Sequence, residues 1–248
     1  MIILSILFFV TALIYSSVGF GGGSTYLALL LIWGVPYTIF PVIALICNII
    51  VVSGNSINFI RSKNTNFNLL FPYLIGSIPF AFIGGSITIE KSLFEILLFC
   101  ILLIAGFFLL IESKSFNNNQ IKINKIPKFV SIFIGSIIGF MSGVVGIGGG
   151  IFLSPLLFLM KAGYPKHITS SASLFILINS IFGIAGQLTK DRVLDELINY
   201  WPLFLIVFIG GQIGSLLNIK FLSNKILALL TSFLVIFVAI RMGIRLLA

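Results

Sequence analysis

The chain carries no charged side chain before Arg61, and long uncharged runs recur along almost its whole length. Of its 248 residues, 59% are hydrophobic and 8% are charged. A transmembrane helix needs about 20 consecutive apolar residues, and runs of that length follow one another here. A transmembrane β-barrel would instead show polarity that alternates over segments of about 10 residues. The sequence therefore predicts an all-α, polytopic integral membrane protein.

The charged residues and cysteines argue against other classes of protein. Lysine and arginine total fifteen and give a net charge of +9, but they are scattered in short loops and form no basic patch for nucleic acid. Cys47 and Cys100 fall inside apolar runs, so we expect neither a disulfide nor a metal site. No extramembrane segment is long enough for a soluble enzyme, so we expect no catalytic residues and no cofactor. The expected partners are the lipid bilayer and a small anionic substrate, and a homo-oligomer stays open.

Two of the apolar runs are interrupted by the same glycine-rich motif. Glycine in a helix loses the most chain entropy, and irregular backbone at membrane depth is tolerated only where protein or a water-filled cavity surrounds it. Two such breaks at corresponding places in two halves indicate the binding site of a transporter. The glycines are Gly19, Gly21, Gly22 and Gly23 in the first copy and Gly146, Gly148, Gly149 and Gly150 in the second.

The whole chain reads as two related halves. Gly22 and Gly149 are 127 residues apart, Asn58 and Gln187 are 129 apart, and further glycine and proline pairs keep nearly the same offset. We therefore predict an N-terminal transmembrane repeat (1–112), a cytoplasmic, lysine-rich linker (113–128) and a C-terminal transmembrane repeat (129–248).

The topology of each half follows from segment lengths. About ten apolar residues follow each break, at 24–33 and 151–160, which as helix span only about 15 Å of a core about 30 Å thick. We therefore favour a hairpin that dips into the membrane and returns, plus three full crossings per half, which makes the repeats inverted. Four crossings per half, with parallel repeats, is the alternative. The count of Lys and Arg on the cytoplasmic side is ten against five in both arrangements.

The breaks could form an anion site without any basic side chain. A glycine-rich turn lets backbone N–H groups point at one place, and the following half-helix adds the positive end of its dipole. Ser24 is placed to cap the first half-helix, and Pro155 is expected near the first turn of the second. The alternative is that the glycines only allow close packing of helices.

The polar segment after each break supplies amides and hydroxyls. Asn48, Asn55 and Asn58 are spaced to share one helical face, which could be a polar wall of a substrate path or a set of interhelical hydrogen bonds. His167 is the one histidine and is expected in a loop at the edge of the membrane. This position argues against an intramembrane hydrolase, which needs a nucleophile and a base within reach of each other. The candidate substrate-binding residues are Gly21, Gly22, Gly23, Ser24, Asn48, Asn55, Asn58, Gly148, Gly149, Gly150, Ser171, Ser173, Asn179 and Gln187.

These motifs together resemble the sulfite exporter TauE/SafE family. The resemblance rests on the duplicated Gly-x-Gly-Gly-Gly, on the polar helix after each copy, and on the Arg61-Ser62-Lys63 loop that leads to Pro72 and Gly84-Gly85. It implies a membrane transporter of sulfur-containing anions such as sulfite and organosulfonates, usually assigned to export. The hydroxyl-rich helix start of the family is kept in the second half alone.

The resulting hypothesis is a secondary transporter, and an exporter, of small sulfur-containing anions in a prokaryotic plasma membrane. The two repeats would rock about a site at the midplane of the membrane. The alternatives are a transporter of another small anion and a non-transporting membrane assembly or interaction protein.

Overall fold

The computed structural model describes residues 2–90, 92–97, 99–100, 123–190 and 197–220, with isolated positions at 103–107 and 233–244. Every regular element in these residues is a helix, so the prediction of an all-α protein is confirmed. Five of the helices are long and apolar enough to cross a membrane. Part of the predicted fourth segment (93–111), residues 113–122 of the linker and most of the last segment (226–247) lie outside the described residues.

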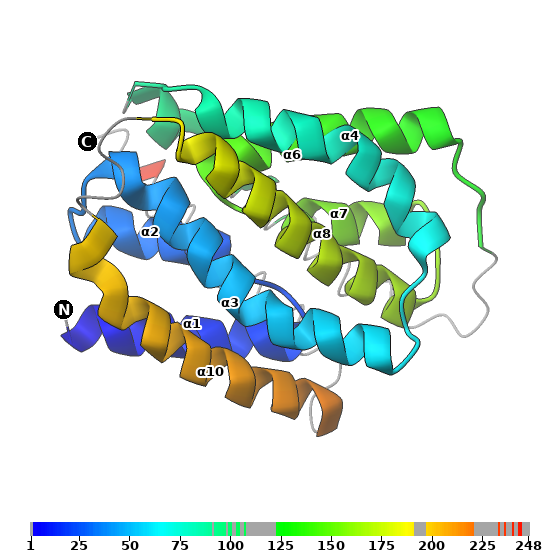
Figure 1. Cartoon of the computed structure of the whole chain (residues 1–248), viewed down its shortest axis with the longest axis horizontal. Coiled ribbons are helices and arrows are strands. Elements are labelled where there is room, and N and C mark those ends of the chain that lie inside the picture. The colour runs from blue at the N-terminus through cyan, green and yellow to red at the C-terminus, as the bar shows by residue number, and fades with distance from the viewer. Residues whose placement is uncertain are drawn as a thin grey trace.

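The two halves contain corresponding helices (Figure 1). In the first half they are α1 (Ile2–Val18), α2 (Gly23–Ile32), the 3₁₀ turn η1 (Tyr37–Ile39), α3 (Phe40–Arg61) and α4 (Phe67–Ser86). In the second half they are α6 (Lys128–Val145), α7 (Gly150–Leu159), α8 (Pro165–Gln187), the 3₁₀ turn η2 (Ile198–Tyr200) and α10 (Trp201–Lys220). Lys128, the last residue of the predicted linker, is therefore the first residue of α6.

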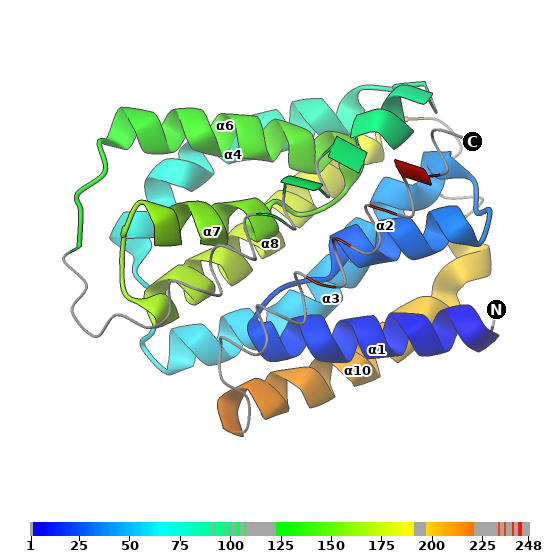
Figure 2. The same cartoon turned by 180° about the vertical axis from the view of Figure 1, so that it is seen from behind.

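Each glycine motif turns the chain back on itself. Figure 2 shows α1 running inward from the N-terminal end and α2 returning toward that end, while α6 and α7 form the same hairpin from the opposite end. The returning helices have 10 residues each, as expected, but α1 and α6 have 17 and 18. At 1.5 Å per residue the inward arms reach about 25 Å and cross most of a membrane. The turns between the arms are fully buried, so protein surrounds both breaks.

The helices of the two halves are packed into each other. At the centre, α3 packs against α8. Outside this pair, α4 lies on α6 and α8, and α10 lies on α1 and α3, so each half covers the hairpin of the other. Glycines permit this approach: a methyl group added at Gly139 would lie 2.6 Å from Cα of Ser77. Small residues let helices pack closely where no hydrophobic effect drives them together.

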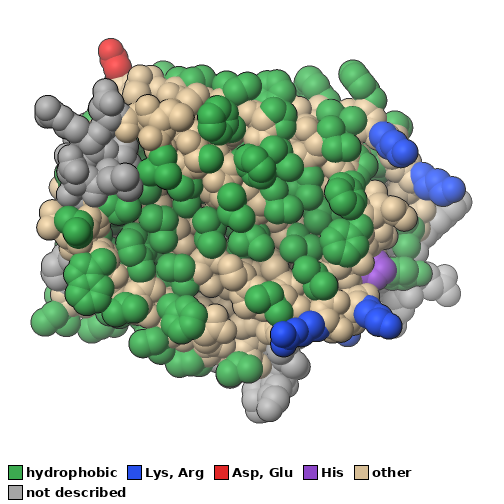
Figure 3. Space-filling view, in the orientation of Figure 1, with side chains coloured by type: hydrophobic (Ala, Val, Ile, Leu, Met, Phe, Trp, Pro, Cys, Tyr) green, Lys and Arg blue, Asp and Glu red, His purple; other side chains and the backbone are tan. Residues whose placement is uncertain are grey.

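Basic side chains gather at one end of the molecule (Figure 3). The loop after α3 meets the start of α8 there, because Oγ1 of Thr65 lies 2.7 Å from Oγ of Ser170. The backbone N–H of Asn124 donates to the carbonyl of Lys161 at 3.0 Å and ties a third segment to the same end. This shared end is what inverted repeats require, and the repeat relation itself stays a prediction. The exposed basic residues of these segments are Arg61, Lys63, Lys125, Lys128, Lys161 and Lys166.

Candidate functional site

The backbone of both breaks depends on glycine. Gly22 and Gly149 have φ of 87° and 79°, in the left-handed region that side chains rarely adopt, and each is the N-cap of the half-helix that follows. The predicted cap by Ser24 is therefore wrong, because the left-handed glycine starts the helix one residue before Gly23. The hydroxyl of Ser24 lies 3.4 Å from that of Tyr15 instead. Pro155, expected in the first turn of α7, lies inside that helix.

The two breaks touch each other at the centre of the molecule, and Asn48 of α3 lies between them. The Asn48 Nδ2 donates a hydrogen bond of 3.1 Å to the carbonyl of Ile147 in the second break. A methyl group added at Gly23 would lie 2.7 Å from Nδ2 of Asn48 and 2.8 Å from the carbonyl oxygen of Ile147. One added at Gly148 would also lie 2.8 Å from Nδ2 of Asn48. No side-chain atom other than hydrogen would fit at these glycines without displacing the amide.

Polar groups of this centre are buried and incompletely paired. Asn48 is 0% exposed, and its Oδ1 has no hydrogen-bond partner among the described residues. In the same residues no hydrogen bond is recorded for the N–H groups of Gly23 and Ser24 in α2, or of Gly150 and Ile151 in α7. Such N–H groups carry the positive end of the helix dipole, about half a charge per helix.

The centre therefore brings the N-terminus of α2, the turn that precedes α7 and the amide of Asn48 to the same place. The buried polar side chains of the described residues are Ser, Thr, Asn and Gln, without Lys, Arg, Asp or Glu. An anion bound here would be held by backbone N–H groups and by the second N–H of Nδ2, since a neutral amide nitrogen has two donors. Such a site can bind a negative charge without a basic residue at membrane depth.

The other predicted amides are not brought to this centre. Asn55 donates from Nδ2 to the carbonyl of Ser16 at 2.9 Å, and Asn58 donates to Oγ of Ser215 at 3.1 Å. They tie α3 to α1 and to α10, as the hypothesis of interhelical hydrogen bonds proposed. The three asparagines therefore have their hydrogen-bond partners in three places: the second break, α1 and α10.

The predicted residues of α8 have separate surroundings. Oγ of Ser173 lies 3.3 Å from that of Ser56 where α8 crosses α3. Asn179 donates to the carbonyl of Phe175 in its own helix, while Ser171 is buried and has no hydrogen-bond partner among the described residues. Sequence reasoning missed Ser180, whose Oγ has no hydrogen-bond partner in the described part of the chain and would lie 3.1 Å from a methyl group at Gly148. Nothing in the sequence distinguishes this serine from its neighbours.

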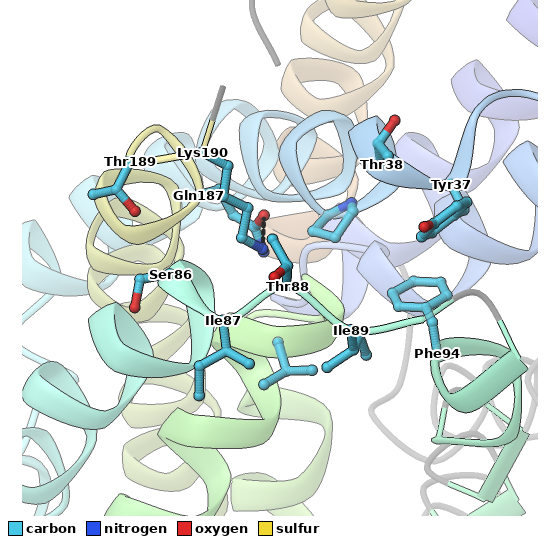
Figure 4. Close-up of a pocket in the computed structure, with 12 residues that line it drawn as sticks. Tyr37, Thr38, Ser86, Ile87, Thr88, Ile89, Phe94, Gln187, Thr189 and Lys190 are labelled. Carbon is cyan, nitrogen blue, oxygen red and sulfur yellow. Dashed lines mark hydrogen bonds between the residues drawn. The ribbon is translucent and has the colours of Figure 1, made fainter. Parts of the chain in front are cut away.

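The remaining candidate, Gln187, lies at the end of the molecule opposite the basic loops, beside a cavity of about 440 Å³ (Figure 4). Its Nε2 donates to the carbonyl of Gly143 at 2.8 Å, and its Oε1 accepts from Nζ of Lys190 at 2.9 Å. Burial lowers the pKa of Lys190 from 10.5 to about 8. The cavity is lined by Tyr37, Thr38, Pro41, Ser86, Ile87, Thr88, Ile89, Phe94, Val144, Gln187, Thr189 and Lys190.

The helices and the buried, broken centre define a multi-pass membrane protein of the transporter class. A family model described as sulfite exporter TauE/SafE matches residues 4–242, and the chain belongs to that family. The chain is 29% identical over 233 residues to probable membrane transporter protein y4hK of Sinorhizobium fredii, with 93% of each chain covered. It is 30% identical over 199 residues to probable membrane transporter protein MJ0441 of Methanocaldococcus jannaschii, covering 76% of this chain and 73% of the relative.

A more distant relative, probable membrane transporter protein YunE of Bacillus subtilis, is 21% identical over 263 aligned positions, covering 95% of this chain and 94% of the relative. No solved structure matches the chain. The resemblance seen in the sequence is thus confirmed at the level of the family, and the chain is a membrane transporter.

Proposed function

We propose that this transporter exports small sulfur-containing anions, such as sulfite or organosulfonates, across a prokaryotic plasma membrane. One observation carries the proposal: Asn48 bridges the two glycine breaks, at Gly23 and at the turn before α7, in a centre where the buried polar side chains of the described residues carry no charge. The description of the family supports the class of substrate.

The anion site would act through dipoles alone. Hydrogen bonds from N–H groups favour an anion, and the low dielectric of the centre strengthens them. Because the buried side chains of the described residues carry no full positive charge, the anion would not be trapped by an ion pair and could leave on either side. The second N–H of Asn48 would complete the set of donors, while its bond to Ile147 holds the amide in place.

We also propose that the halves 1–112 and 129–248 are inverted repeats, with the linker 113–128 and the basic end facing the cytoplasm. The opposed hairpins and the reciprocal packing of α4 on α6 and of α10 on α1 support this arrangement. The reciprocal packing also suggests which parts move as units. The α1–α2 hairpin would move with α10, and the α6–α7 hairpin with α4, so each unit would contain helices of both repeats.

The function is tested with purified protein in liposomes. The panel of substrates is sulfite, sulfate, thiosulfate and short alkanesulfonates, with protein-free liposomes and the Asn48→Leu variant as controls. Saturable flux of sulfite or a sulfonate, absent in both controls, is the expected result. Folded protein that moves none of these anions would contradict the proposal and favour the assembly or interaction protein.

The topology is tested with single cysteines at Asn64 and Tyr164 in a background that lacks Cys47 and Cys100. Asn64 follows α3, and Tyr164 is 54% exposed just before α8. An impermeant thiol reagent should label both positions when it is applied from the cytoplasmic side, and neither position when it is applied from outside. Labelling from opposite sides would be incompatible with inverted repeats.

A further inference from the structure

The cavity beside Gln187 has the composition of an anion site and lies apart from the centre where the breaks meet. Five hydroxyl-bearing side chains line it, and Lys190 is the one cationic residue among its described lining residues (Figure 4). The hydroxyls belong to Tyr37, Thr38, Ser86, Thr88 and Thr189. Ser86 and Thr189 already donate to the carbonyls of Ile83 and Gly186, at 2.8 and 2.7 Å. The ammonium of Lys190 and the hydroxyls of Tyr37 and Thr88 are donors that suit the oxygens of a small oxyanion.

The ammonium of Lys190 is not neutralised by the part of the chain that the structure describes. Its recorded partner is the neutral amide oxygen of Gln187, at 2.9 Å. Burial is the cause of its lower pKa, with no contribution from a nearby charge, and a pKa of about 8 leaves the group mostly protonated at neutral pH. Among the described residues this half-buried, positively charged group has no counter-ion, and a bound anion would supply one.

The position of the cavity connects it to the second break. Gln187 donates to the carbonyl of Gly143, in the last turn of α6 before the break. Pro41 and Val144 line the cavity, and a methyl group added at Gly146 would lie 2.5 Å from Cα of Pro41. The cavity therefore ends against the backbone that leads to the central site.

We propose that this cavity is a second anion site, in which Lys190 and the surrounding hydroxyls bind an oxyanion or sulfonate at the end of the molecule opposite the basic loops. The inference rests on the proposed function in that it takes the same class of anion. It places a charged collecting site next to a central site that has no charge. An anion would be concentrated by Lys190 and then passed to neutral donors, from which it dissociates readily.

The test measures the cavity without measuring transport. Thr88 is exposed on the cavity wall, and Thr88→Cys in a background without Cys47 and Cys100 can react with an anionic or a cationic methanethiosulfonate reagent. The measured quantity is the ratio of the labelling rate with the anionic reagent to that with the cationic reagent. This ratio should be at least about fivefold higher at Thr88→Cys than at the control Ile198→Cys, since Ile198 is 70% exposed in η2. Lys190→Gln should remove this preference and Lys190→Arg should keep it.

Methanesulfonate, used as the probe anion, should slow labelling by both reagents at Thr88→Cys and not at Ile198→Cys. A preference that survives Lys190→Gln, or the absence of protection by methanesulfonate, would overturn the proposal. Ile87→Cys, also exposed on the cavity wall, repeats the measurement, and failure of both cysteines to react would show a cavity closed to ions and would overturn it too.

A lipid phosphate offers the same chemistry as a free anion, so the labelling is compared in nanodiscs of zwitterionic lipid and of lipid with phosphatidylglycerol. Protection by methanesulfonate in zwitterionic lipid supports a site for free anions. Protection by phosphatidylglycerol alone contradicts it. Because labelling needs no flux, a protein that labels as expected but transports nothing would refute the proposed function and leave the cavity site standing.

Discussion

The two glycine breaks have nearly the same backbone and different surroundings. Gly19 and Gly22 in the first correspond to Gly146 and Gly149 in the second, and all four have positive φ. The first break faces polar side chains, with Asn48 against Gly21 and Gly23 and with Thr11 against Gly22. The second break meets polar side chains at Gly148 alone, whereas Ile176 lies against Gly150, and Ile138 and Phe175 lie against Gly149.

This difference shows that the two breaks share the geometry of their backbone and not the chemistry of their surroundings. Both hairpins need the left-handed turns, because those turns reverse the chain inside the protein. A single amide can serve both turns, because the breaks are in contact. One polar side chain at the centre is therefore enough to contact both breaks. The corresponding place in the second half can hold an apolar side chain, Ile176, that packs against the break.

The largest expected effect comes from adding a negative charge at each helix N-terminus. Ser24→Asp and Ile151→Asp change the same position of the two half-helices, 127 residues apart, and the matching Asn variants serve as controls of similar size. At 4 Å and an effective dielectric near 20, a carboxylate would repel a bound anion by about 4 kcal/mol, close to a thousandfold in affinity. Anion-induced thermal stabilisation is the measurement.

If both helices hold the anion, each Asp variant should bind far more weakly than its Asn partner. A loss confined to the Ser24 pair would restrict the site to the first break. Equal binding within both pairs would mean that the breaks serve packing and that the anion binds elsewhere.

The next effect tests the amide at the centre. Asn48→Leu removes the donor to the carbonyl of Ile147 and leaves that buried carbonyl without a hydrogen bond, which should lower the free energy of unfolding by about 1–3 kcal/mol. Anion flux should fall by up to about a hundredfold. Ile176→Leu conserves volume at the corresponding place in the second half and should cost less than about 1.5 kcal/mol of stability, with flux retained. Flux in liposomes and thermal unfolding are measured for both. Equal losses of flux would show that the two breaks contribute alike.

A smaller effect distinguishes Gln187 from Asn58, which occupy corresponding positions in the two polar helices. Asn58→Leu breaks one interhelical hydrogen bond, worth about 0.6 kcal/mol in a membrane, and should leave flux near normal. Gln187→Leu removes the bonds to Gly143 and Lys190 and should lower flux severalfold at low anion concentration. Unchanged flux in Gln187→Leu would leave the cavity without a part in transport.

The smallest effect is a pH dependence of flux. The pKa of Lys190 lies at about 8, so the ammonium is present below that pH and lost above it. Methanesulfonate flux at low concentration should therefore fall between pH 7 and 9, by a factor of less than about five. Lys190→Arg, which stays charged, should not show this fall. Tyr37→Phe, which removes the other titratable side chain among the described lining residues, should keep it. A fall that persists in Lys190→Arg would assign the titration to another group.

Much of the fold followed from the sequence because helices in a membrane are local structures. Backbone groups in a lipid bilayer must be paired within the segment, so apolar length alone locates a helix. The predicted segments at 39–60 and 67–89 are observed as α3 (Phe40–Arg61) and α4 (Phe67–Ser86). The half-helices after the breaks were also located to within one residue, since three glycines stop a helix wherever they occur.

What the sequence could not decide depends on contacts between distant residues. Spacing on α3 placed Asn48, Asn55 and Asn58 on one face, but their partners are Ile147, Ser16 and Ser215, which belong to three other elements. Only tertiary packing brought the two breaks together across Asn48, and only it put Lys190 beside a cavity. An amide has the same pattern in the sequence whether it binds a neighbouring helix or a ligand, because its role is set by the groups that packing leaves within hydrogen-bonding distance.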